Sequence, residues 1–224
     1  MAQACVKALA VSIQAGIPTV TWGGPGVGKT KITTAICRTL ERKMHTFIPA
    51  IHEPADFGGY PCPSGDYVRM LPAGAMWQSI QEGDVVFLDE ISCAPPAVQA
   101  ALLRPVLEGC VGDLVLPPVS WVAAANPPDQ AAGGWNLAPP LANRCCHVPW
   151  RADVIEWRDG MISGFPDPTF PRLPADWKRH FPITYAQVAS YVGANPQKLE
   201  PGVPKDESKA GGAWASPRTW EMTA

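Results

Sequence analysis

Gly23-Gly24-Pro25-Gly26-Val27-Gly28-Lys29-Thr30 is the stretch of sequence that decides the fold of this chain. It has the pattern GxxxxGK[ST] and follows a short apolar run at residues 20–22. Residues 29–43 then contain no glycine or proline and repeat apolar residues at helical spacing. A glycine-rich turn without a ligand is the alternative interpretation, but a strand before the motif and a helix after it favour a phosphate-binding loop.

Each part of this loop has a distinct chemical role. Glycines allow backbone N–H groups to converge on phosphate oxygens, and the helix that follows directs its positive end at them. Lys29 is expected to reach the β- and γ-phosphates of ATP, and Thr30 to bind Mg²⁺ through its hydroxyl group. The predicted nucleotide-binding residues are therefore Gly23, Gly24, Pro25, Gly26, Val27, Gly28, Lys29 and Thr30.

A second motif, which contains two acidic residues, supports ATP hydrolysis as well as ATP binding. The apolar run at residues 85–88 ends in Asp89 and Glu90, which lie beside the phosphate loop if both strands are central and parallel. We expect Asp89 to hold the magnesium ion and Glu90 to activate the attacking water. The alternative is that the two acids only cap the helix that follows them, a common arrangement of acidic residues.

The remaining pattern predicts an α/β fold with a parallel sheet covered on both faces. Strands are expected at residues 20–22, 46–51, 85–88, 121–125 and 145–148. Helices are expected at residues 4–15, 29–43, 94–109 and 183–194, the third of them kinked at Pro105.

Composition narrows the function class. The net charge of −2 leaves nucleic acid binding unsupported, and no stretch approaches the length of a membrane span. Seven cysteines without a CxxC motif indicate reduced thiols, and the four histidines share no ligand spacing. The start of the sequence has no signal-type segment, so we expect a cytoplasmic protein.

Residues 87–103, Phe-Leu-Asp-Glu-Ile-Ser-Cys-Ala-Pro-Pro-Ala-Val-Gln-Ala-Ala-Leu-Leu, resemble the Walker B strand and following helix of MoxR-type AAA+ ATPases. Residues 122–127 are similar to the sensor 1 motif of that family, which gives Asn126 the role of contacting the γ-phosphate and the attacking water. The resemblance also implies the strand order 5-1-4-3-2 and a homo-oligomeric, hexameric ring. Taken alone, Asn126-Pro127 after a strand is more typical of a turn.

Two arginines acquire roles from the same resemblance. Arg144 occupies the position of an arginine finger that reaches the ATP of a neighbouring subunit, although Cys145 stands where the family usually has an aromatic residue. Arg151 and Arg158 are alternatives for the finger. Arg218 resembles the sensor 2 arginine, which touches the γ-phosphate and opens a lid helix, yet only six residues follow it, so a partial or truncated lid is expected.

The expected organisation is an AAA+ P-loop domain at residues 1–150, a proline-rich linker at 151–181 and a partial helical lid at 182–224. Residues 53–61 follow the second strand, where AAA+ rings often present a loop to the pore or to a partner. Phe57 and Tyr60 are the candidates for exposed aromatic side chains there, although an ordinary surface loop explains the same residues. Tryptophans outside the strands, Trp150 among them, are assigned to lid packing or subunit contacts.

These features predict an ATPase subunit that couples hydrolysis to chaperone-like remodelling of a partner. The MoxR resemblance implies a protein client or a von Willebrand factor A domain partner, although no residue of this chain identifies it. Two other functions stay open. One is a P-loop kinase, and the other is a nucleotide-dependent scaffold or switch without turnover.

Overall fold

The computed structural model describes residues 2–127, 134–206 and 211–223 of the chain. Its centre is a five-stranded sheet in which every pair of neighbouring strands is parallel. The spatial order is β2-β5-β8-β1-β9, which is the expected order 5-1-4-3-2 read from the opposite edge. The predicted P-loop α/β fold is therefore confirmed. The five strands are β1 (Thr19–Trp22), β2 (Met44–Phe47), β5 (Val85–Leu88), β8 (Ser120–Ala125) and β9 (Cys146–Pro149).

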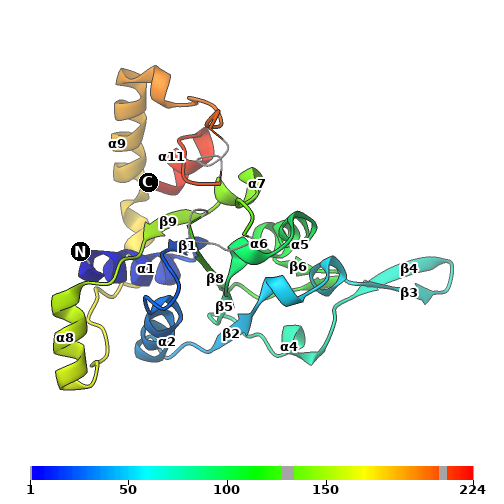
Figure 1. The fold of residues 1–224 in the computed structure, drawn as a ribbon. Helices are drawn as coiled ribbons and strands as arrows, with labels where there is room; N and C mark the ends of the chain where they lie inside the picture. Colours follow the sequence, from blue (N-terminus) through cyan, green and yellow to red (C-terminus); the bar gives the residue numbers. More distant parts are fainter. Residues whose placement is uncertain (1, 128–133, 207–210, 224) are drawn as a thin grey trace.

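Both faces of the sheet are buried, because alternate residues of the central strands enter different apolar clusters. Val85 and Phe87 of β5 pack with residues of α1 (Ala2–Ala15) and α2 (Lys29–Thr39). Val86 and Leu88 face the opposite cluster, which contains residues of α5 (Pro96–Ala101), α6 (Leu103–Glu108) and α7 (Pro139–Ala142). Figure 1 shows the resulting three-layer arrangement.

The helix expected at residues 94–109 is divided into α5 and α6, with Leu102 between them. Pro105 explains the division, since it has no N–H to donate to the carbonyl four residues earlier and its ring crowds that carbonyl. The break therefore lies one turn before the proline. The pattern of apolar residues located this helical region correctly, and the kink is confirmed.

Two sequence-based boundaries are wrong. The strand expected at residues 46–51 is β2, which ends at Phe47, and Pro49–Ile51 forms a short 3-10 turn, η1. The helix expected at 29–43 ends at Thr39, because Glu41 has a left-handed backbone with φ of 57° that an α-helix does not accept.

The segment after β2 carries an outlying hairpin. Helix α3 (Pro54–Gly58) leads into β3 (Tyr60–Ser64) and β4 (Tyr67–Leu71), which project from the body of the domain (Figure 1). Helix α4 (Ala75–Gln78) then returns the chain to β5, with η2 (Ile91–Cys93) directly after that strand.

Phe57 is not an exposed aromatic residue, contrary to the expectation from the sequence. It is fully buried between Phe47, His52 and Trp77, whereas Tyr60 is exposed and donates a hydrogen bond to Asp56. Phe57 lies on the inner side of a short helix, α3, whose N-terminus has a capping box formed by Glu53 and Asp56.

A second hairpin supports the first. The strands β6 (Cys110–Val111) and β7 (Leu114–Val115) meet at a turn whose Asp113 bonds the backbone of Met70 twice, through its own N–H and through its carboxylate. Gly112 in this turn has φ of 57°, and a Cβ atom there would lie 2.2 Å from the carbonyl oxygen of Met70.

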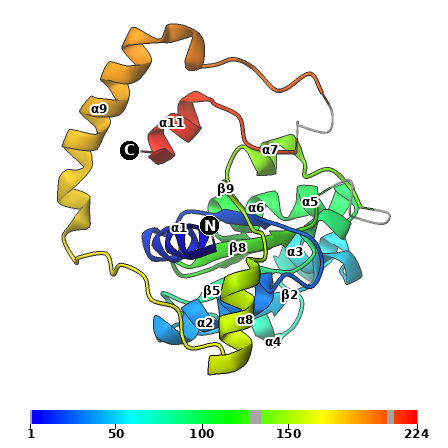
Figure 2. The ribbon, with the colours of Figure 1, turned by 60° about the vertical axis from the view of Figure 1, so that its left-hand side comes forward.

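After β9 the chain forms α8 (Val154–Ser163), η3 (Trp177–His180), α9 (Phe181–Ala194), η4 (Pro196–Lys198) and α11 (Pro217–Thr223). Helix α8 lies in the segment expected to be a linker, and α11 begins at Pro217, directly before Arg218. Figure 2 shows α9 standing apart from the sheet, with α11 beside it. Within the described residues, no helix is long and apolar enough to cross a membrane.

Gly112→Ala should lower the free energy of unfolding by about 3 kcal/mol, because the new Cβ meets a backbone carbonyl as well as an unfavourable φ. Gly65→Ala is the matched control: Gly65 also lies in a hairpin turn at positive φ, but nothing lies within 4 Å of its Cβ position. That control should lose only about 1 kcal/mol. Urea denaturation of both variants checks this, and equal losses would contradict the steric argument.

Candidate nucleotide-binding site

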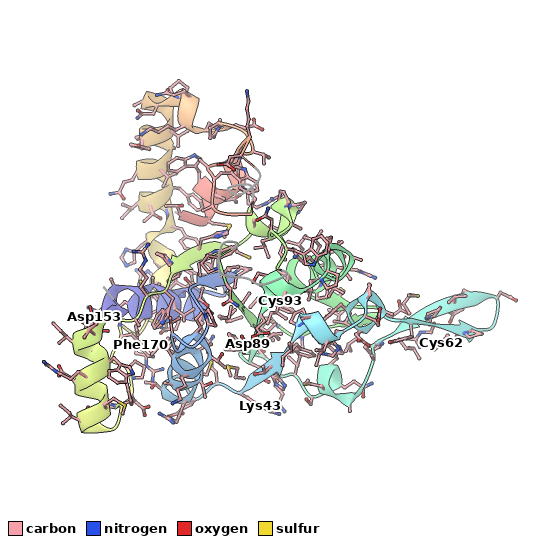
Figure 3. The ribbon with its side chains drawn as sticks, viewed as in Figure 1. Lys43, Cys62, Asp89, Cys93, Asp153 and Phe170 are labelled. Atoms are coloured by element: carbon pink, nitrogen blue, oxygen red, sulfur yellow. The ribbon has the colours of Figure 1, made fainter. Side chains whose placement is uncertain are left out.

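The carboxyl ends of β1, β5 and β8 meet at one edge of the sheet, and a cavity of about 260 Å³ opens there. Figure 3 shows Asp89 in this central position, whereas Cys62 marks the outlying hairpin. Nine of the predicted site residues line the cavity: Pro25, Gly26, Val27, Gly28, Lys29, Thr30, Asp89, Glu90 and Asn126. Parallel strands bring residues distant in sequence to this edge, so the convergence follows from the topology.

The phosphate loop is shaped by backbone conformations that favour glycine. Gly26 and Gly28 have φ of 76° and 92°, and Gly28 directly precedes α2. Gly23 is required for a different reason, since a Cβ atom at that position would lie 2.4 Å from the carbonyl oxygen of Trp150. The glycines therefore permit both the turn and a close approach of neighbouring backbone.

Lys29 is the central cation of the site. Its Nζ donates hydrogen bonds to the carbonyl oxygens of Gly23 at 2.6 Å and Gly24 at 3.0 Å, and to Oδ1 of Asn126 at 2.9 Å. Burial lowers the pKa of Lys29, while the carboxylates of Asp89 and Glu90 act in the opposite direction. The loop carbonyls and Asn126 thus hold an ammonium group at the cavity, where a phosphate anion can take the place of an acceptor.

Thr30 and Asp89 form the part of the site that fits a hard cation. The Thr30 hydroxyl lies 3.0 Å from Oδ2 of Asp89, and the N–H of Glu90 donates to Oδ1 of the same carboxylate. One hydroxyl and one carboxylate suit Mg²⁺, which keeps several waters and binds few protein oxygens beside substrate phosphates. No group of three or more His, Cys, Asp or Glu side chains that could hold a metal ion occurs among the described residues.

Glu90 has a backbone conformation that is uncommon for its residue type. Its φ of 53° and ψ of 39° lie in the left-handed region, and it occupies the N-cap position of η2. Such conformations cost free energy and gather at functional positions. The turn carries the Glu90 side chain from the end of β5 to the wall of the cavity.

Ser92 supports Asn126 and was not found by sequence reasoning. Its Oγ accepts a hydrogen bond of 3.0 Å from the N–H of Asn126, and its side chain is buried. The η2 turn thereby fixes the end of β8, from which the Asn126 amide reaches Lys29. A serine two residues after the acidic pair gives no distinctive signal, because its partner lies 34 positions away.

Trp150 also holds the site, which corrects its assignment to lid packing or subunit contacts. Its indole Nε1 donates a 3.0 Å hydrogen bond to the carbonyl oxygen of Val27 inside the phosphate loop. Its backbone N–H donates to Trp22, the residue before the loop, and only 6% of its surface is exposed. Trp150 therefore supports the phosphate loop from the end of β9.

The two predicted arginines lie together but do not line the cavity of their own chain. Arg144 donates to the carbonyl oxygen of Pro140 at 2.7 Å, and Arg218 lies 3.4 Å from Oδ1 of Asn143. Burial lowers the pKa of Arg144, and the positive charge of Arg218 lowers it further. Of the alternatives, Arg158 pairs with Asp159 on the exposed helix α8, and Arg151 is exposed.

Comparison with known proteins identifies the family of this domain. Residues 19–145 match the AAA domain of the dynein-related subfamily, a span of more than half the chain. This chain is a member of that AAA family. The matched region of the AAA domain begins at β1 and ends between Arg144 and β9. No curated protein matches the sequence.

Solved structures share the fold at low sequence identity. A candidate ATPase from Cytophaga hutchinsonii superimposes with a TM-score of 0.51 and 17% identity, covering 87% of this chain and 67% of that one. Two RuvB variants from Thermotoga maritima each give a TM-score of 0.50 and 20% identity, with 72% of this chain covered. The AAA chain spans about half the length of these RuvB chains, 50% and 51%. At such identities the likeness shows the fold alone.

Trp150→Phe should weaken ATP binding about fivefold, since it keeps most of the buried ring but releases the Val27 carbonyl from a hydrogen bond of about 1 kcal/mol. Trp77→Phe is the control: its indole also donates to a backbone carbonyl, that of Asp56, but neither residue lines the cavity. Both variants should lose similar thermal stability. Titration with a fluorescent ATP analogue measures the affinity. Equal affinities of the Trp150→Phe and Trp77→Phe variants would show that the Trp150 hydrogen bond does not support ATP binding.

Proposed function

We propose that this AAA domain binds ATP with Mg²⁺ and hydrolyses the γ-phosphate as one subunit of a homo-oligomeric ring. The observation that supports the proposal best is the convergence of a cation, a hydroxyl–carboxylate pair and a second carboxylate on one cavity. Lys29 supplies the first, Thr30 and Asp89 the second, and Glu90 the third. A site that only binds nucleotide does not need the third group beside the other two.

In the proposed reaction the protein mainly positions groups and compensates charge. The loop amides and Lys29 bind the β- and γ-phosphates, and Thr30 with Asp89 holds the magnesium ion. Mg²⁺, when bound, neutralises charge on the phosphate oxygens. Glu90 orients the attacking water and accepts its proton, and Asn126 contacts the γ-phosphate and that water from the end of the neighbouring strand, β8.

The residues of the cavity wall favour an active site that is shared between neighbouring subunits. Its basic residues among those described are Lys29 and Lys31, and neither predicted arginine belongs to it. In the proposed ring, Arg144 of a neighbouring subunit reaches the γ-phosphate as an arginine finger, and Arg218 senses the same group when the lid closes. A MoxR-like role in remodelling a protein client, with a von Willebrand factor A domain protein as one such partner, is the biological setting that we propose.

Two other functions predict different products. A P-loop kinase would transfer the phosphate to an organic acceptor, so an acceptor rather than water would gain it. A nucleotide-dependent scaffold would bind ATP tightly and release no phosphate even when assembled. Measuring free phosphate and nucleotide affinity on the same preparation distinguishes both alternatives from an ATPase.

We also propose that the chain is divided into an α/β domain up to residue 150, a connecting segment and a partial lid.

Glu90→Gln should retain ATP and lower the rate of phosphate release at least about a hundredfold, because the amide cannot accept the proton of water. Glu108→Gln is the matched control, an exposed glutamate that pairs with Arg104 outside the cavity. Lys29→Ala should lower ATP affinity instead. Phosphate release and nucleotide titration measure the two effects, and an undiminished rate in the Glu90 variant would exclude it as the base.

Mixing Arg144→Ala subunits with Glu90→Gln subunits should restore part of the ATPase activity. Each variant alone is defective, but a mixed interface can combine an intact Glu90 with an intact Arg144 from the neighbour. Arg104→Ala subunits in place of the Arg144 variant provide the control for loss of an arginine elsewhere on the surface. Absence of recovery in mixed assemblies of verified stoichiometry would show that Arg144 does not act between subunits.

A further inference from the structure

The residue before the phosphate loop is bound by a histidine from the neighbouring strand. Trp22 ends β1, and its indole Nε1 lies 2.8 Å from Nδ1 of His147 in β9. Val20 is the direct partner of His147 in the sheet, so Trp22 lies two residues along on the same face. The planes of the two rings are nearly parallel, with an angle of 10° and centroids 5.9 Å apart.

The other side of this imidazole reaches the turn that bears the arginines. Nε2 of His147 lies 2.8 Å from the carbonyl oxygen of Ala142, the last residue of α7. An indole N–H can only donate and a carbonyl can only accept, so Nδ1 accepts from Trp22 and Nε2 donates to Ala142. Both bonds together therefore require the neutral imidazole with its proton on Nε2.

The environment of His147 agrees with that protonation state. Burial lowers its pKa below the usual value, while the hydrogen bond to the Ala142 carbonyl acts in the opposite direction. The ring is thus neutral at neutral pH, where Nδ1 keeps its lone pair for the Trp22 indole.

The turn beyond Ala142 anchors both predicted arginines. Asn143 follows it directly, and its Oδ1 accepts from the Ser216 hydroxyl at 2.9 Å and lies 3.4 Å from Nη1 of Arg218. Arg144 is the next residue in the chain. One side chain, His147, therefore contacts the entrance to the phosphate loop on one side and the arginine-bearing turn on the other.

We propose that His147 is a positioning residue that sets the phosphate loop and the arginine-bearing turn relative to one another through its two hydrogen bonds. The inference rests on the proposed function, because it assigns nucleotide binding to the loop and charge compensation in the neighbouring subunit to the turn. The bond to Trp22 then acts on ATP affinity, and the bond to Ala142 acts on turnover.

Two conservative variants separate the two bonds. Asn places its Oδ1 at the same number of bonds from Cα as Nδ1 of histidine, so His147→Asn keeps an acceptor for Trp22 and loses the donor to Ala142. Gln places its Nε2 like Nε2 of histidine, so His147→Gln keeps that donor and loses the acceptor. His147→Gln should raise KM for ATP about fivefold with kcat nearly unchanged, and His147→Asn should lower kcat about fivefold with KM nearly unchanged.

The controls separate this proposal from a purely structural role and from the proposed function. Each variant loses one hydrogen bond, so thermal denaturation should shift by a similar amount in both. His52→Asn and His52→Gln alter a histidine paired with Asp56, outside the cavity, and should change neither parameter. Parallel changes of KM and kcat in the two His147 variants would overturn the proposal.

If the wild-type protein releases no phosphate, the proposed function fails, yet the loop side of the inference is still tested. A fluorescent ATP analogue should then bind about fivefold more weakly to His147→Gln than to His147→Asn. Equal binding to the two variants would refute the role of the Trp22 bond whether or not ATP is hydrolysed.

Discussion

The ammonium group of Lys29 is the interaction on which the site depends. It is held by two carbonyls of its own loop and by the Asn126 amide from β8, which also aligns the ends of two neighbouring strands. Lys29 and its acceptor Asn126 both line the cavity, so the cation is fixed at the cavity wall. The sheet, the glycine turn and the buried serine behind Asn126 all serve to keep this geometry.

Strand β9 supplies the second half of the framework. It pairs with β1 over the whole length of that strand, and the residue that follows it, Trp150, bonds the phosphate loop through its indole. The loop is consequently fixed between Asn126, which directly follows β8, and Trp150, which directly follows β9. Because β1 lies between β8 and β9, Asn126 and Trp150 act on one loop although they lie 97 and 123 positions from their partners in it.

Sequence reasoning located the parts of the fold that local patterns determine. The phosphate loop, the acidic pair and the strand before Asn126 were found because their residue types and spacings are distinctive, and the strand order followed from the family resemblance. Ser92, His147 and Trp150 were missed as parts of the site because their roles depend on partners distant in sequence. Phe57 was misplaced because a single turn of helix has too few residues to show a period, and its burial is determined by the aromatic side chains around it.

The absence of a side chain at Gly23 has a mechanical consequence. The Trp150 carbonyl fills the space where a Cβ atom would lie, and Trp150 is also the point at which the chain leaves the sheet for α8 and α9. The backbone of Gly23 therefore contacts the backbone of Trp150 directly, and no side chain of Gly23 separates them. This close contact therefore ties the position of the phosphate loop to that of the first peptide of the segment that leaves the sheet.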